Sequence, residues 1–308
     1  MLAFGWSNSR NPAGFAQKGE ALFSGGCVGL SRESSFIAYR RITLATGQPF
    51  RGRRERGSYA PPAAWSGPHS CVQARNCYDP PPSMANTVDL ATARRILRDD
   101  VLGPDEIGAV FEVTVQAPPL SYSLAELELA AQQGEALIFH IDRDAAGPLT
   151  LQRLIDRFPG AFDSRLLRKT GYQLKDEWGI ELEPLAKTDT CTTGWILVRK
   201  QILNSTRNLA YEEQEAALAH DAAKKQIRVG VLRRRTAIEI AYDLILYHAA
   251  RGERLLTQTW DWSSSRTLDA GYLNVGGFGP NGMQLLSYSP AVRHGALGVC
   301  PARLAMGN

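Results

Sequence analysis

The chain has 308 residues, enough for one large or two modest domains, and a formal net charge of +4. It contains no run of eighteen apolar residues, and its first residues are too polar for a secretory signal, so membrane spanning and export are not expected. We therefore expect a cytoplasmic protein that has no membrane partner.

Residues 1–83 differ in composition from the rest of the chain. They hold eight of the 17 prolines and three of the five cysteines, and they carry a net charge of +6 against −2 for residues 84–308. We interpret residues 1–83 as a disordered or mis-annotated leader, with Met84 as the true start. The arginine-rich residues 51–56 could contact phosphates, but few aromatic residues accompany them, so nucleic-acid binding is not expected.

Residues 84–252 predict a helical α+β body. Asp89, Ser123 and Thr150 are suitable N-cap residues, and Ser123 forms a capping box with Glu126. Apolar runs over residues 135–142 and 194–198 predict two buried strands. The predicted helices cover residues 90–100, 105–110, 124–133, 151–158, 211–226 and 232–250.

Several polar residues of the body were weighed as functional groups. We expect His140 to be a satisfied polar residue within its strand and Asp142 and Asp144 to lie in a solvated turn. Three consecutive arginines, Arg233 to Arg235, are expected in the first turn of the last helix, as exposed surface. Scattered acids between residues 163 and 183 indicate a solvated face, because no spacing pairs two of them for acid and base catalysis.

Residues 253–308 predict a β-rich C-terminal module. Trp260 and Trp262 alternate with polar residues, as in a half-buried strand, and turn residues separate short apolar runs at residues 272–275, 283–288 and 296–299. Residues 279–282, with the sequence Gly-Pro-Asn-Gly, predict a hairpin turn. Cys300 is expected to be a buried, inert thiol.

The order of motifs in this module resembles the end of the formylglycine-generating-enzyme-like C-type-lectin fold. The motifs are Trp-Asp-Trp-Ser-Ser from Trp260, Val-Gly-Gly-Phe from Val275, a loop with Arg293, and Leu-Gly-Val-Cys-Pro-Ala-Arg from Leu297. Retroelement-diversified variable proteins use this fold to bind ligands. The whole chain also resembles an uncharacterised bacterial protein family. The fold usually has an arginine directly before the Gly-Gly pair, and this chain has none directly before Gly276. The oxidase branch of the fold also needs a second cysteine near the first, so the resemblance does not imply oxidase catalysis.

The leading hypothesis is a non-catalytic recognition protein that binds a protein or a small ligand through its C-terminal loops. A phage-related or mobile-element structural protein is the alternative, and an enzyme using Asp261, His248, His294 and Cys300 is third. We expect no cofactor and no metal, because the cysteines show no zinc-ligand spacing. The predicted ligand-binding residues are Trp260, Asp261, Trp262, Arg266, Asn281, Gln284, Tyr288, Arg293 and His294, in a loop surface that also includes residues 264–269.

Overall fold

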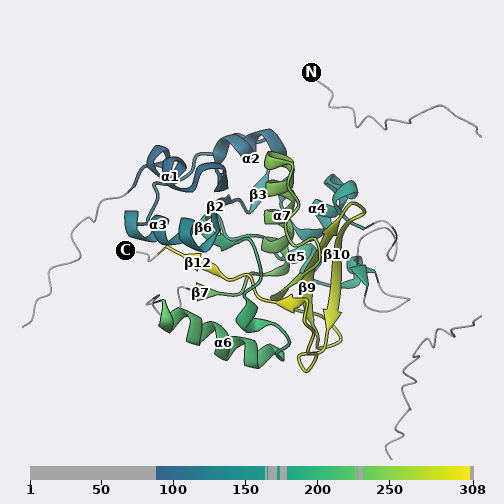
Figure 1. Ribbon diagram of the computed structural model, residues 1–308. Coiled ribbons are helices and arrows are strands. Elements are labelled where there is room, and N and C mark those ends of the chain that lie inside the picture. Colours follow the sequence, from purple (N-terminus) through teal and green to yellow (C-terminus); the bar gives the residue numbers. More distant parts are fainter. Residues whose placement is uncertain are drawn as a thin grey trace, which may run out of the picture. The chain divides into compact units, whose positions relative to one another are not determined.

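The computed structural model describes residues 88–163, 165, 172–173, 179–225, 227 and 232–305. The predicted leader and its arginine-rich segment lie outside the described residues. The protein is an α+β protein, as the sequence predicted, with two five-stranded sheets (Figure 1). None of the described helices is both long and apolar enough to cross a membrane.

The first sheet has the strand order β1-β2-β6-β12-β7. Its strands are short, except for β2 and β6, which pair antiparallel over their whole lengths. The C-terminal strand β12 lies between β6 and β7 and is antiparallel to both. The bounds are β1 (Val101–Leu102), β2 (Glu135–His140), β6 (Gly194–Arg199), β7 (Leu232–Arg233) and β12 (Ala302–Leu304).

The second sheet has the order β11-β8-β9-β10-β5, and its centre is an antiparallel meander of three strands. The predicted hairpin turn is confirmed, because β9 ends at Gly279 and β10 begins at Gly282. The bounds are β5 (Tyr172–Gln173), β8 (Trp260–Arg266), β9 (Tyr272–Gly279), β10 (Gly282–Tyr288) and β11 (Leu297–Gly298). A separate pair, β3 (Arg143–Asp144) and β4 (Gly147–Pro148), forms a two-stranded ribbon.

Local capping signals place most of the helices where the sequence predicted them. Asp89 accepts a hydrogen bond from Thr92 N at the start of α1, and the Ser123 capping box begins α3, which ends at a left-handed Gly134. The helices are α1 (Leu90–Leu97), α2 (Pro104–Phe111), α3 (Leu124–Gln133), α4 (Leu151–Arg157), α5 (Leu185–Thr188), α6 (Tyr211–Lys224) and α7 (Ala237–Arg251). Short 3₁₀ turns are η1 (Arg98–Asp100), η2 (Pro159–Ala161), η4 (Ile180–Leu182) and η5 (Asn204–Thr206).

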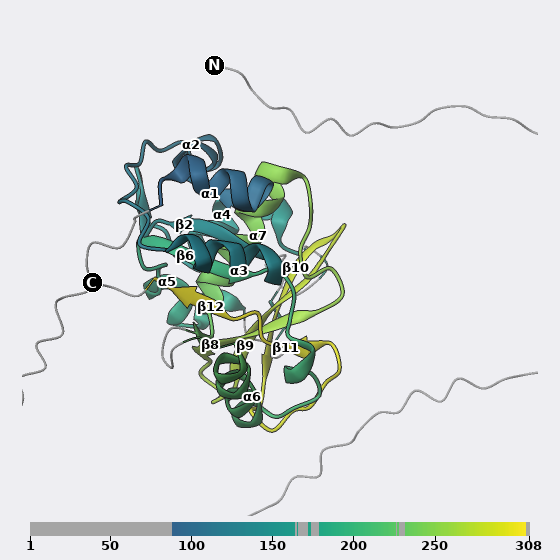
Figure 2. The same ribbon diagram turned by 60° about the vertical axis from the view of Figure 1, so that its left-hand side comes forward.

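Helix α7 is the centre of the fold. Every residue from Ala237 to Tyr247 is buried, because α7 packs against β8 and β9 of the second sheet and also contacts β2 of the first. Figure 2 shows α1 and α3 in front of β2 and β6, with α7 behind them. The predicted single apolar stripe was therefore too narrow, since the helix is buried on all sides, and its polar residues Glu239 and Asp243 are paired with arginines.

The predicted start of this helix at Leu232 was wrong. Leu232 and Arg233 form β7, and the helix begins five residues later, after Thr236. Thr236 accepts from Glu239 N, and the Glu239 side chain accepts from Thr236 N, which together make a capping box. The three arginines therefore precede the helix and do not crowd its first turn.

The predicted body and C-terminal module share one sheet and one core. The described residues belong to a single compact unit, and one hydrophobic cluster contains residues from both parts, among them Leu137, Tyr242 and Val275. The sharing follows from β12, which carries the end of the module back into the first sheet. The predicted boundary at residue 252 thus coincides with the end of α7, but the same hydrophobic core continues on both sides of it.

Candidate functional site

The candidate site is the face of the second sheet that points away from α7, which we call the distal face. Leu273, Val275, Met283 and Leu285 belong to the main core, so the alternate residues of the same strands point to the other side. Residues directly opposite one another on neighbouring strands share a face. The register therefore defines the distal face as three rows across β8, β9 and β10: Trp260, Gly276 and Gln284; Trp262, Asn274 and Leu286; Arg266, Tyr272 and Tyr288.

In the first row, Trp260 and Gln284 are half-buried and Gly276 is buried. A side chain on Gly277, which has a φ of +56°, would lie 2.8 Å from the Trp260 ring and 3.1 Å from Gln284 Oε1. Gln284 Nε2 donates to Asp163 Oδ2 at 3.3 Å, which fixes the amide at one end of the row. The glycine thus leaves the indole and the amide beside each other with no side chain between them.

The middle row contains polar groups that the protein leaves without a partner. Asn274 and Trp262 are fully buried, yet neither amide atom of Asn274 nor the Trp262 Nε1 has a hydrogen-bond partner among the described residues. The same holds for the half-buried Trp260 Nε1. A buried polar group without a partner costs roughly 1–3 kcal/mol, and these atoms lie beneath the surface of the face.

Aromatic rings close one end of the distal face. Tyr211 of α6 stacks on Tyr272 with ring centroids 3.9 Å apart, and it meets the Trp262 ring edge-on at 5.2 Å. Burial raises the pKa of Tyr211 to about 12, so its hydroxyl stays protonated at neutral pH. The Arg234 guanidinium lies 4.0 Å from the centre of the Tyr211 ring and donates to Trp262 O at 2.9 Å, which fixes α6 against β8.

The structure brings five of the nine predicted site residues onto this face, namely Trp260, Trp262, Arg266, Gln284 and Tyr288. Trp262, predicted as a ligand-binding residue on a half-buried strand, is corrected: it is fully buried and forms the floor of the face under Tyr211. Asp261 is also corrected: it points to the opposite side, fully buried, and accepts from Arg235 Nη2 at 2.8 Å. Sequence reasoning missed Asn274 and Tyr272, which the alternation around Val275 could have placed beside Trp262.

The other three predicted residues lie in the connections around the face. Asn281 is exposed in the β9–β10 turn, and its side-chain oxygen accepts from Arg165 once the amide is oriented to fit its donors. Arg293 is exposed and donates to Glu213 at 2.5 Å. The Nδ1 atom of the exposed His294 accepts from Ala296 N at 3.2 Å, so this ring nitrogen shapes its own loop.

The cluster considered for an enzyme is not assembled. Cys300 N donates to Asp261 Oδ1 at 2.9 Å, but both residues are fully buried, and burial raises the pKa of the Cys300 thiol well above its usual value. His294 is exposed in a loop, and His248 lies at the end of α7 with its ring 5.4 Å from the Phe278 ring. The expectation that Cys300 is buried is confirmed.

A buried charge network lies behind the second sheet. Arg235 Nη1 donates to Asp243 Oδ2 at 2.5 Å, and Asp243 Oδ1 accepts from His140 Nε2 at 2.7 Å. Burial alone would lower the pKa of Arg235, but the carboxylates of Asp261 and Asp243 raise it above its usual value. The prediction for His140 is confirmed, whereas the prediction that Arg234 and Arg235 are exposed surface was wrong, since they are 5% and 3% exposed.

Three of the other weighed acids are buried, whereas Asp142 is half-exposed and residues 176 and 177 lie outside the described residues. Asp144 is buried and accepts from Arg153 at 2.7 Å and Arg157 at 3.2 Å, so the predicted solvated turn was wrong at this residue. Asp163 and Glu183 are likewise buried, which corrects the predicted solvated face at these two positions. In the part of the chain that the structure describes, no group of three or more His, Cys, Asp or Glu residues could hold a metal ion.

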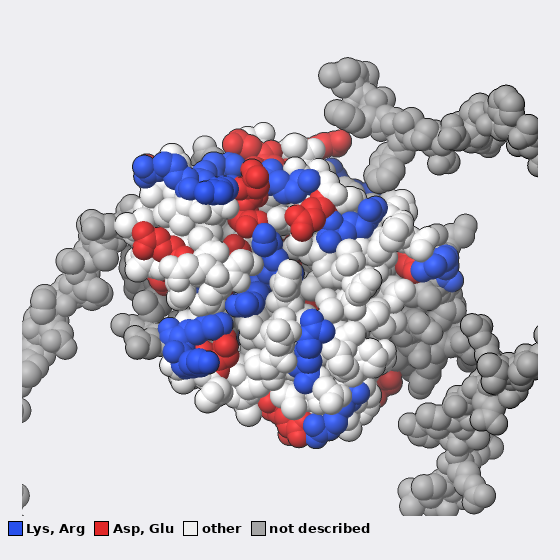
Figure 3. All heavy atoms as spheres, in the orientation of Figure 1, with Lys and Arg blue, Asp and Glu red and all other residues white. Residues whose placement is uncertain are grey.

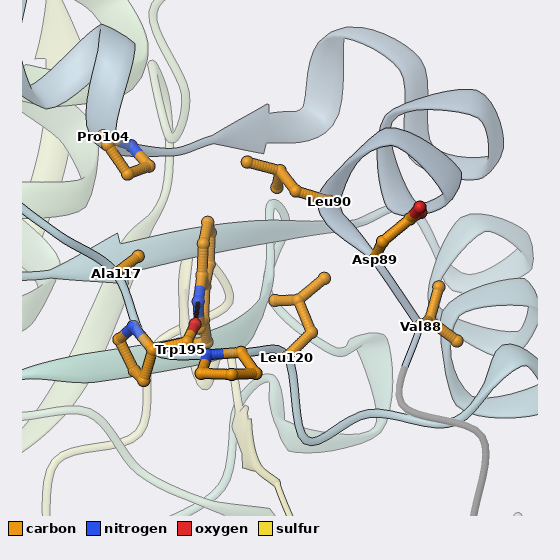
Figure 4. Close-up of a pocket in the computed structure, with 9 residues that line it drawn as sticks. Val88, Asp89, Leu90, Pro104, Ala117, Leu120 and Trp195 are labelled. Carbon is orange, nitrogen blue, oxygen red and sulfur yellow. Dashed lines mark hydrogen bonds between the residues drawn. The ribbon is translucent and has the colours of Figure 1, made fainter.

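A pocket of about 420 Å³ beside α1 is apolar and has its polar groups already bonded (Figure 4). The Trp195 ring stands in it, and its Nε1 donates to Pro118 O at 2.9 Å. Asp89, at the edge of the same pocket, is the N-cap of α1. The pocket thus offers a ligand apolar contact and fewer hydrogen bonds than the distal face.

No family model matches the chain, and no similar curated protein or solved structure was found. The function is therefore argued from the geometry of the structure. Figure 3 shows basic and acidic side chains interspersed over the face in view.

Proposed function

We propose that this protein is a non-catalytic recognition protein that binds a protein segment or a small molecule on the distal face of its second sheet. The observation that carries the proposal is the set of partly buried aromatic side chains, Trp260, Tyr272 and Tyr288, on one face of the sheet. A ligand with an apolar surface would pack against these rings. Aromatic side chains with few rotatable bonds suit such contacts, because they lose little entropy on binding.

The C-type-lectin-like interpretation of the C-terminal module is part of this proposal. It is supported by the order of the motifs and by the position of the Trp-Asp-Trp segment on β8, beside the Val-Gly-Gly-Phe segment of β9. Trp260 and Gly276 are cross-strand partners. The loops after Tyr288 and before Tyr272 then border the binding face, as a ligand-binding module requires.

The test is a screen of the fluorescently labelled full chain against arrays of glycans and peptides. Trp260→Ala and Gln284→Ala each remove a side chain of the first row without touching the buried charge network, and Arg95→Ala on α1 is the matched control. We expect binders that the control retains and the two variants lose, and we expect the bound ligand to be recovered with unchanged mass. Binders that all variants retain, a screen without any binder, or a ligand recovered in altered form would each refute the proposal.

A further inference from the structure

A second pocket carries chemistry that the distal face does not use. It has a volume of about 290 Å³ and lies between the segment after β6 and the loop from α7 to β8. Lys200, Arg207 and Arg254 line it, together with the hydroxyl residues Thr257 and Thr259. Its lining is therefore basic and rich in hydrogen-bond donors, which suits an anion.

Two of these cations have no carboxylate partner within the described part of the chain. The Arg207 guanidinium donates to Asn204 Oδ1 at 3.0 Å and to the carbonyl of Gly295 at 2.9 Å, both uncharged acceptors. Arg254 lies over the Phe278 ring at 5.5 Å, and its buried Nε has no hydrogen-bond partner among the described residues. In contrast, Lys200 is paired with Asp100 at 2.7 Å.

The loop that presents Arg254 is held in a strained backbone conformation. Leu256 is buried and has a φ of +53°, in the left-handed region that residues other than glycine and asparagine seldom adopt. Its carbonyl accepts from Phe278 N at 3.1 Å, which ties the loop to β9. A strained residue kept in a fixed loop at a pocket is typical of binding sites.

One acid opposes the basic residues. Glu253 is exposed at the pocket and is the only carboxylate in its described lining. Two unpaired guanidinium groups against one carboxylate leave the lining with one positive charge in excess. Because a guanidinium presents a planar fork of donors that fits the oxygens of a phosphate, the pair is better suited to phosphate than to a monovalent halide.

We propose that this pocket binds the phosphate group of a small phosphorylated molecule, with Arg254 and Arg207 as its principal donors and Thr257 and Thr259 as further ones. Glu253 then acts against binding and limits the affinity. The site is separate from the function proposed for the distal face and does not depend on it.

The proposal is tested by calorimetric titration of the full chain with inorganic phosphate, at an ionic strength matched with chloride. We expect saturable binding that weakens at least about tenfold in Arg254→Ala and in Arg207→Ala and tightens in Glu253→Gln. Arg95→Ala, which removes an equal charge at an exposed position of α1, should bind phosphate as the natural chain does. Arg254→Lys keeps the charge but loses the fork of donors, so it should also weaken binding.

The result that overturns the proposal is an absence of phosphate binding by the natural chain, or binding that Arg254→Ala and Arg207→Ala leave unchanged. An equal loss in Arg95→Ala would also overturn it, because it would show attraction by net charge alone. Circular dichroism of each variant confirms that it is folded. If Arg254→Ala does not fold, Arg207→Ala and Glu253→Gln still decide the question, since they are predicted to act in opposite directions.

Discussion

The guanidinium of Arg235 links Asp261 of β8, 2.8 Å away, to Asp243 of α7, 2.5 Å away, in a part of the protein that solvent does not reach. Asp243 continues the network to His140 of β2. One arginine therefore connects the central helix to the second sheet and, through Asp243, to the first.

We expect Arg235→Ala to destabilise the protein by about 3–5 kcal/mol, because it leaves the buried carboxylate of Asp261 without its charged partner. Asp261→Ala should cost about 1–3 kcal/mol, because Arg235 keeps Asp243 but Cys300 N loses its acceptor. Arg266→Ala, on an exposed residue of the same strand, should change stability by less than about 0.5 kcal/mol. Urea denaturation followed by circular dichroism measures all three. A loss below about 1 kcal/mol in Arg235→Ala would show that water replaces the arginine.

Stability should fall in acid because of two glutamates. Burial opposes ionisation of both, but hydrogen bonds from Arg94, Gly103 N and Arg251 lower the pKa of Glu106 from 4.5 to about 2, and Arg233 does the same for Glu239. A lowered folded-state pKa stabilises the protein above the unfolded value, and this contribution, about 3 kcal/mol for each group, disappears as the pH falls from 4.5 to about 2.

The measurement is the free energy of unfolding across this pH range. Glu106→Gln should be less stable at neutral pH, and its free energy of unfolding should change less steeply with pH between 4.5 and about 2. A slope equal to that of the natural chain would mean that Glu106 is not ionised in the folded protein.

Gly282 should not tolerate a side chain. Its φ is +105°, and an added Cβ would lie 2.4 Å from the backbone carbonyl carbon of Phe162. We expect Gly282→Ala to cost at least about 1–3 kcal/mol, because both the backbone and the contact are strained. Gly160→Ala is the control, since nothing lies within 4 Å of its added Cβ. Thermal unfolding compares the two, and an equal midpoint would contradict the close approach of β10 to Phe162.

Cys191 and Cys300 should resist thiol reagents in the folded protein. Burial raises the pKa of both thiols well above their usual value, so the reactive thiolate is scarce and shielded. Alkylation followed by peptide mass spectrometry should find both cysteines unmodified in buffer and modified in denaturant. Labelling of Cys300 without denaturant would show that the region around Asp261 opens.

The elements with strong local signals could be predicted from the sequence. The caps at Asp89, Ser123 and Thr150 set their helices correctly, and the turn at residues 279–282 set the hairpin, because each signal acts within a few residues. The alternation at Trp260 and Trp262 also placed both indoles on one face. Which face solvent reaches depends on Tyr211, 51 residues before Trp262, and no local pattern gives that contact.

The buried arginines were missed for a related reason. Arg234 and Arg235 look like surface residues next to Arg233, but their partners, Trp262 O and Asp261, are 28 and 26 residues later in the chain. A local signal did exist for the helix start, since Thr236 and Glu239 have capping-box spacing. The prediction started the helix at Leu232 and so counted the three arginines and Thr236 as helical, which passed over the cap.

Strand β12 lies between β6 and β7 in the sheet, although it is synthesised after both. As the chain emerges from the ribosome, β2 and β6 can pair, but β6 keeps an open edge until Ala302 to Leu304 have been added and have docked. During translation that edge is a template for strands of other chains, and a chaperone or rapid completion would protect it. A chain cut before Ala302 would keep the edge permanently open and should aggregate.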